Sequence, residues 1–182
     1  MLPKGSMLEK NIPKTGRQTD DKQRMMEFSD DRNRLDASKK IILVIEDESA
    51  FAQILYDFAR ELNYQCVVAA SAEEGLELAL QHIPHAILLD MKLPDQSGLM
   101  VLARLKEEGR TRHIPVHILS VDDRREAAMQ MGAVGYLIKP VSREQLHDAF
   151  ATIEAKIAQK MKRVLVIESS DQQANAVASL IA

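Results

Sequence analysis

The sequence predicts an α/β domain: a parallel sheet of five strands with helices on both of its faces. Short apolar runs, typical of strands buried on both sides, alternate five times with stretches in which apolar residues recur at helical spacing. Such regular alternation favours parallel strands joined by crossover helices. Acidic, hydroxyl or basic residues stand directly after four of the runs, where open parallel sheets bind ligands.

Length and composition indicate a soluble protein with one domain and a tail or linker. The 182 residues are 46% hydrophobic and 28% charged, and the net charge of -3 gives no reason to expect a nucleic-acid partner. The single Cys66 excludes an internal disulfide and fits a reducing cytosol. No apolar run approaches the ~20 residues of a membrane span. We expect a cytoplasmic chain without membrane contact of its own, although a longer parent protein could be membrane-anchored.

Residues 1–39 are predicted to be a linker, largely disordered or partly helical. The segment is polar and charge-mixed, and its few apolar residues cannot hold a helix alone. A short helix is expected from about Asp20 to Arg34. The predicted domain covers residues 40–160.

The first two strand–helix units follow from apolar patterning and capping residues. The run Ile41–Ile45 predicts a buried strand, and Ser49 can cap the helix after it. The apolar positions of that helix are Phe51, Ile54, Leu55, Phe58 and Leu62. A second strand is expected over Cys66–Ala69, followed by a helix over Ala72–Gln81 that Ser71 caps.

The same alternation continues to the end of the domain. The expected elements are a strand over His85–Leu89, a helix over Leu99–Glu108, a strand over Val116–Leu119, a helix over Asp123–Met131 and a strand over Tyr136–Ile138. Ser142 and Gln145 form a capping box at the start of a last helix, which continues towards Met161. Right-handed crossovers favour the flavodoxin-like strand order 2-1-3-4-5, so residues after the first and third strands should meet.

The candidate site consists of the polar residues at these strand ends. They are Glu46 and Asp47 after the first strand, Asp90 after the third, Ser120 after the fourth and Lys139 after the fifth. Three carboxylates in one crevice repel each other, and a divalent cation with oxygen ligands, Mg²⁺, removes that repulsion. A hydroxyl and an ammonium group suit a phosphoryl group. The hypothesis that uses every member is phosphoryl transfer onto Asp90, giving an aspartyl phosphate.

Each residue also has an ordinary structural explanation. Glu46 and Asp47 could cap the next helix, Ser120 could be an N-cap and Lys139 a solvated loop residue. Tyr136, on a short strand, is normally a core residue. The combination, rather than any single residue, supports the site.

Over residues 40–159 the chain resembles the receiver domain of bacterial two-component response regulators. The run VIEDE at residues 44–48 is similar to the acidic metal-binding pair of that family. LLDMKLPDQSG at residues 88–98 is similar to the phosphoacceptor loop, and GYLIKP at residues 135–140 to the fifth-strand motif, in which the Lys-Pro bond is often cis.

The resemblance implies Mg²⁺-dependent transfer to Asp90 from a phosphohistidine, carried by a histidine kinase or a histidine phosphotransfer domain. The implied metal ligands are Glu46, Asp47, Asp90 and the backbone carbonyl of Met91, and Lys139 would contact the phosphate. Ser120 and Tyr136 match the switch pair. They would reshape the face made by the helix over 123–131, the strand over 136–138 and the last helix, which could also form a homodimer.

Three positions depart from the family pattern or flank its site. Val121 stands where the family commonly has a smaller residue, and we expect it to narrow the path to the phosphate. Lys92 and Asp122 lie two residues after Asp90 and Ser120, at positions that influence phosphate loss. Their opposite charges are expected to pair across the mouth of the site, which predicts a comparatively long-lived phosphoryl group.

Residues 161–182 resemble the start of a second, truncated receiver-like domain. The run Val164–Glu168 repeats the type of Leu43–Glu46, but Ser169 stands where Asp47 would. With no DNA-binding output in the chain, this arrangement resembles hybrid histidine kinases or multi-receiver proteins. Two other functions stay open. One is a non-phosphorylated pseudo-receiver that binds proteins. The other is an aspartate-nucleophile phosphatase, which needs an acid where Lys92 stands; a receiver by itself is not a turnover enzyme.

Overall fold

A computed structural model of the chain describes residues 29–158, and in this part five parallel strands form one sheet in the order β2-β1-β3-β4-β5. The strands are β1 (Ile41–Ile45), β2 (Gln65–Ala69), β3 (Ala86–Asp90), β4 (Val116–Ser120) and β5 (Gly135–Ile138). The helices are α2 (Ser49–Glu61), α3 (Ala72–His82), α4 (Gly98–Glu107), α5 (Arg125–Gln130) and α6 (Arg143–Ala158). The predicted fold class and strand order are confirmed.

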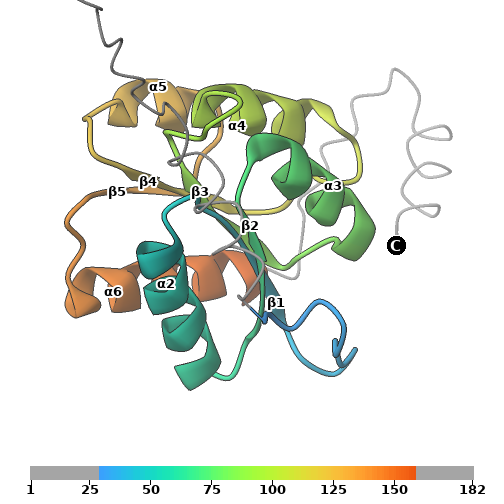
Figure 1. The fold of residues 1–182 in the computed structure, drawn as a ribbon. Helices are drawn as coiled ribbons and strands as arrows, with labels where there is room; N and C mark the ends of the chain where they lie inside the picture. The colour runs from blue at the N-terminus through green and yellow to red at the C-terminus, as the bar shows by residue number, and fades with distance from the viewer. Residues whose placement is uncertain (1–28, 159–182) are drawn as a thin grey trace, which may run out of the picture.

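The sheet is buried on both faces, which explains why its strands are almost entirely apolar. Successive residues of a strand point to opposite sides. Leu43 and Ile45 of β1 therefore join the core under α3 and α4, whereas Ile42 and Val44 join the core with α2 and α6. Figure 1 shows α2 and α6 on one side of the sheet and α3, α4 and α5 on the other. Among residues 29–158 no helix is long and apolar enough to cross a membrane.

Two of the predicted helix starts are confirmed, and one is wrong. Ser71 accepts a hydrogen bond from the Glu74 N–H (3.2 Å), and Ser142 with Gln145 forms the capping box. Ser49 does not cap α2 but is its first residue, because the helical bonding already begins at the Glu48 carbonyl, which accepts from the Ala52 N–H (2.9 Å).

Two helices differ from their predicted extent or burial. In α2, Ile54 lies outside the buried face, with 54% of its surface exposed. Helix α5 is shorter than predicted and begins at Arg125. The backbone torsions of the preceding Arg124, φ -121° and ψ 30°, are not helical, and its N–H donates to the Tyr136 hydroxyl (2.9 Å).

The N-terminal strap, defined here as residues 29–39, packs along the free edge of β2. The carboxylate of Asp30 accepts the Val68 N–H (2.8 Å) and that of Asp31 accepts the Cys66 N–H (2.9 Å). The Asp31 N–H in turn donates to the Cys66 carbonyl (3.1 Å), and the Arg32 guanidinium donates to the Val68 carbonyl. These bonds occupy backbone groups that an edge strand otherwise leaves free.

The strap corrects part of the linker prediction. Residues 31–34 form a turn rather than the end of the predicted helix from Asp20 to Arg34, because Asp30 and Asp31 are held by β2 and not by helical bonds. The rest of the predicted linker, residues 1–28, lies outside the described residues. So does the predicted second copy over residues 161–182.

Candidate functional site

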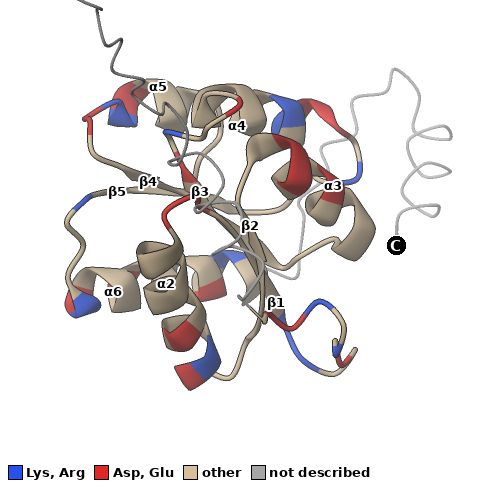
Figure 2. Cartoon of the chain, viewed as in Figure 1, with Lys and Arg blue, Asp and Glu red and all other residues tan. Residues whose placement is uncertain are grey.

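Three carboxylates meet at the carboxyl edge of the sheet. Glu46 and Asp47 follow β1, and Asp90 is the last residue of β3. Because β1 and β3 are neighbours with Ile45 opposite Leu89, their ends lie side by side. Each of the three acids offers an oxygen within 4.8 Å of the other two. Figure 2 shows acidic segments where these central strands end. The convergence that the strand order predicted is therefore present.

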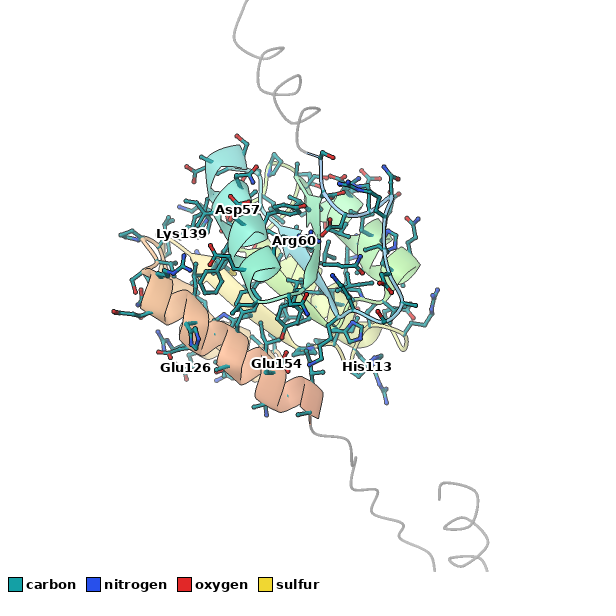
Figure 3. All side chains as sticks on the ribbon, turned by 90° about the horizontal axis from the view of Figure 1, so that it is seen from below. Asp57, Arg60, His113, Glu126, Lys139 and Glu154 are labelled. Carbon is teal, nitrogen blue, oxygen red and sulfur yellow. The ribbon has the colours of Figure 1, made fainter. Side chains whose placement is uncertain are left out.

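Lys139, after β5, is the cation that faces these acids. Its ammonium Nζ lies 2.8 and 2.9 Å from the two oxygens of Glu46 and 3.1 Å from Oδ2 of Asp90. The peptide bond to Pro140 is cis, and the Lys139 N–H donates to the Ser120 carbonyl (2.7 Å). Figure 3 labels Lys139 beside α2. These contacts exclude the alternative that Lys139 is a solvated loop residue.

Burial makes the acidic cluster electrostatically strained. Glu46 is fully buried, and burial, reinforced by the charge of Asp90, raises its pKa to about 7 despite the bonds from Lys139. Burial followed by the Asp90 charge also raises the pKa of Asp47. At Lys139 burial opposes the charge, but the carboxylates of Glu46 and Asp90 outweigh it and raise the pKa. One ammonium does not neutralise three carboxylates.

The donor set fits a small divalent cation. Carboxylate oxygens are hard ligands of the kind Mg²⁺ prefers, and exposed Asp47 leaves one side of the cluster open to water, which Mg²⁺ retains. The Met91 carbonyl accepts the Gly98 N–H (3.0 Å) and keeps a second lone pair. A Cβ at Gly98 would lie 2.3 Å from the Asp90 carbonyl oxygen, so this loop needs glycine there.

Ser120 and Tyr136 both bond to the loop between β4 and α5. Ser120 is buried, and its Oγ accepts the Asp122 N–H (3.0 Å). The Tyr136 ring is buried in the core, while its hydroxyl donates to the Asp122 carbonyl and accepts the Arg124 N–H (2.9 Å). Tyr136 is thus a core residue through its ring and is also linked to this loop through its hydroxyl.

An open cavity of about 500 Å³ lies between the loop after β3 and the loop after β4. Across it the expected ion pair is present, with Lys92 Nζ 3.2 Å from Oδ2 of Asp122. Both side chains are largely exposed. Val121 is about half exposed and is not among the residues that line this cavity, so any effect on the path to Asp90 has to act from outside it.

Two residues near the site were not singled out from the sequence. Asp95, in the loop after β3, accepts the N–H groups of Ala72 (2.9 Å) and Glu73 (3.0 Å), which ties that loop to the start of α3. Phe51 of α2 places its ring centroid 4.5 Å from Lys139 Nζ. Asp95 follows Pro94 and has the sequence signature of a turn residue, and Phe51 has that of a core residue. The sequence around each residue therefore does not predict the contact that it makes.

Comparison with known proteins agrees with this geometry. The family model for the response regulator receiver domain matches residues 42–151. A polar-differentiation response regulator, DivK of Brucella ovis, is 33% identical over 106 residues, which is 57% of this chain and 86% of the relative. The DivK protein of Brucella anthropi is 32% identical over the same length.

Solved structures show the same fold. A response regulator receiver domain protein of Clostridium thermocellum is 32% identical, with a TM-score of 0.59 over 66% of this chain and 96% of that chain. The chemotaxis response regulator CheY4 of Vibrio cholerae shares the fold at 19% identity, with a TM-score of 0.60 over 63% of this chain and 98% of its own. With the family model covering most of the described residues, the chain belongs to the response regulator receiver domain family.

Proposed function

We propose that the chain is a phospho-accepting receiver, which takes a phosphoryl group from a phosphohistidine onto the carboxylate of Asp90. An Asp90 oxygen forms a bond to phosphorus as the phosphorus–nitrogen bond breaks, and the leaving imidazole nitrogen takes up a proton. The observation that carries the proposal is the position of Asp90, which shares one ammonium group, Lys139, with the buried Glu46 and also lies near Asp47. Lys139 would neutralise negative charge on the transferred group.

Mg²⁺ is the proposed cofactor, held by Glu46, Asp47, Asp90 and the Met91 carbonyl. When bound, the cation supplies positive charge that offsets both the carboxylate repulsion and the charge of the phosphoryl group. Its binding requires the acids to be ionised, so the raised pKa of Glu46 makes Mg²⁺ affinity rise with pH through about 7.

The proposed output is a change of the loop between β4 and α5, driven by Ser120 and Tyr136. Both already contact this loop through its Asp122 and Arg124 backbone groups. A phosphoryl oxygen on Asp90 that recruits the Ser120 hydroxyl would release its bond to Asp122 N–H. The face formed by α5, β5 and α6 would change with the loop, and we propose it as the surface for a partner or a homodimer.

The proposed partner is a histidine kinase or a histidine phosphotransfer domain. Receiver domains as a family interact with such proteins. The polar sequence of residues 1–28, typical of a linker, and that of residues 161–182, which resembles the start of a second receiver-like unit, support a place within a hybrid histidine kinase or a multi-receiver protein of the cytoplasm.

The test is incubation with acetyl phosphate and Mg²⁺, followed by intact mass spectrometry and peptide mapping. A stable adduct that forms in the wild type and is lost in Asp90→Asn supports the proposal. No adduct would instead favour the pseudo-receiver, a protein-binding scaffold with the same fold. Steady release of phosphate without an accumulating adduct would favour a phosphatase.

A further inference from the structure

We propose that Phe51 is a positioning residue for Lys139, holding its ammonium group against the site through a cation–π contact. The inference rests on the proposed phosphoryl transfer and deepens it. Phe51 lies in the first turn of α2, and its ring centroid is 4.5 Å from Lys139 Nζ, well inside the ~6 Å range of such contacts. The ring is half-buried and packs against the core cluster beneath α2 and α6.

The other contacts of Lys139 show why an uncharged partner such as the Phe51 ring matters for keeping its ammonium group in place. Among the described residues, the hydrogen-bond partners of its ammonium group are all carboxylates, namely Glu46 and Asp90, and both belong to the acidic cluster that a cation would occupy. A divalent ion that draws on the same oxygens competes with Lys139 for them. The face of Phe51 is not a ligand of a hard cation, so its hold on the ammonium group persists when those oxygens are engaged.

Burial strengthens this contact. Only 13% of the Lys139 side chain is exposed, and cation–π contacts gain strength as the cation loses its water. The long lysine stem has many rotamers, and an ammonium group fixed near Asp90 Oδ2 needs no rearrangement when charge develops on a transferred group. Phe51 thus acts through Lys139 and touches no reacting atom itself.

The test uses Phe51→Leu, which keeps an apolar side chain but removes the ring face, and Phe51→Tyr, which restores a ring. The matched control is Phe58→Leu. Phe58 lies on the same helix and carries a similar contact, with Arg143 at 5.2 Å from its ring, away from the acidic cluster. All variants are made in the full chain, and circular dichroism at 25 °C establishes that each is folded.

The first measurement is the NMR shift of the Lys139 ε-methylene protons in metal-free protein. A proton over a ring face is shifted upfield, so we expect an upfield shift in the wild type, Phe51→Tyr and Phe58→Leu that is lost in Phe51→Leu. An ordinary random-coil shift in the wild type would overturn the proposal. This readout does not depend on phosphorylation.

The second measurement is the rate of adduct formation with acetyl phosphate, together with Mg²⁺ affinity by amide shift titration. We expect Phe51→Leu to slow phosphorylation about two- to thirtyfold, the range from an exposed to a desolvated cation–π contact, with Mg²⁺ affinity unchanged and the rate restored in Phe51→Tyr. An adduct that forms at the wild-type rate in Phe51→Leu would refute the positioning role alone. No adduct in the wild type would refute the proposed function itself, and the role of Phe51 with it.

Discussion

The acidic cluster of the site and the acidic pair of the strap differ in how many cationic partners their carboxylates have. Asp30 and Asp31 are as buried as Asp90, yet each has a guanidinium partner, Arg32 for the first and Arg60 for the second. Each also accepts a backbone N–H of β2. At the site, Glu46 and Asp90 share the ammonium group of Lys139, and Asp47 lies beside them in the same cluster.

The difference in charge balance separates a structural cluster from a functional one. Buried carboxylates whose oxygens are all satisfied fasten one part of the molecule to another, and removing one leaves unpaired groups behind. Carboxylates that outnumber their cationic partners repel each other, which destabilises the folded protein and favours the binding of a further cation. The same residue types therefore predict opposite responses to mutation at the two places.

The largest expected effect is on the strap. Asp31→Ala leaves the Cys66 N–H and the Arg60 guanidinium without their acceptor and should lower the free energy of unfolding by about 3 kcal/mol. Asp36, an exposed acid of the same strap, is the control, and Asp36→Ala should have a much smaller effect on the free energy of unfolding. Urea denaturation measures both. Equal losses would mean that the strap is held by something other than its buried acids.

The opposite sign is expected at the site. In metal-free protein Asp90→Asn removes one of three clustered charges and should raise the free energy of unfolding by about 1 kcal/mol. Lys139 keeps its partner Glu46 in this variant. The gain that Mg²⁺ gives the wild type in the same urea experiment should be lost. A destabilised Asp90→Asn protein would place Asp90 with the strap acids, as a structural group.

The pH dependence of stability sharpens the contrast. The folded-state pKa of Glu46, about 7, lies above its unfolded value of 4.5, so the folded protein binds more protons between these values. Its contribution to stability is present below about pH 4.5 and is lost as pH rises through 7, by up to about 3 kcal/mol. Glu46→Gln should flatten this slope in metal-free protein. Identical slopes in the two proteins would contradict the raised pKa.

The buried His117 should change the stability with pH in the opposite direction to Glu46, over a neighbouring pH range. Burial lowers its pKa, and its Nδ1 has no hydrogen-bond partner among the described residues. The unfolded chain therefore binds the extra proton, and this stability is lost as pH falls below about 6.5. His117→Asn, measured beside Glu46→Gln, should weaken acid destabilisation only. Unchanged acid destabilisation would assign that effect to other groups.

The site and the strap also differ in how far the sequence predicts them. The five strands, their order and the meeting of Asp47 with Asp90 follow from apolar patterning and from the rules of parallel sheets. The strap has no such pattern, because acidic side chains bonding to backbone N–H groups hold it, and those bonds depend on tertiary placement. Polar residues with few apolar neighbours therefore suggested a linker. Phe51 is a similar case, since a helix-face phenylalanine predicts core packing and not a lysine contact.

The smallest effect on stability is expected at the mouth of the site. Lys92 and Asp122 form an exposed ion pair, so Lys92→Ala should change the free energy of unfolding by less than about 0.5 kcal/mol. If the pair impedes the attacking water, the same variant should lose its phosphoryl group a few times faster than the wild type. Val121→Ala tests whether that residue also restricts access. Unchanged loss of phosphate in both variants, followed by mass spectrometry, would argue against a shielded phosphoryl group.

The excess of carboxylates at the site is tested most directly by an NMR titration with Mg²⁺ at pH 7.5. We expect one-site binding in the wild type, at least about tenfold weaker binding in Asp47→Asn, and wild-type affinity in Asp57→Asn, which alters an exposed acid of α2. A wild-type protein that binds Mg²⁺ no better than Asp47→Asn would contradict the account.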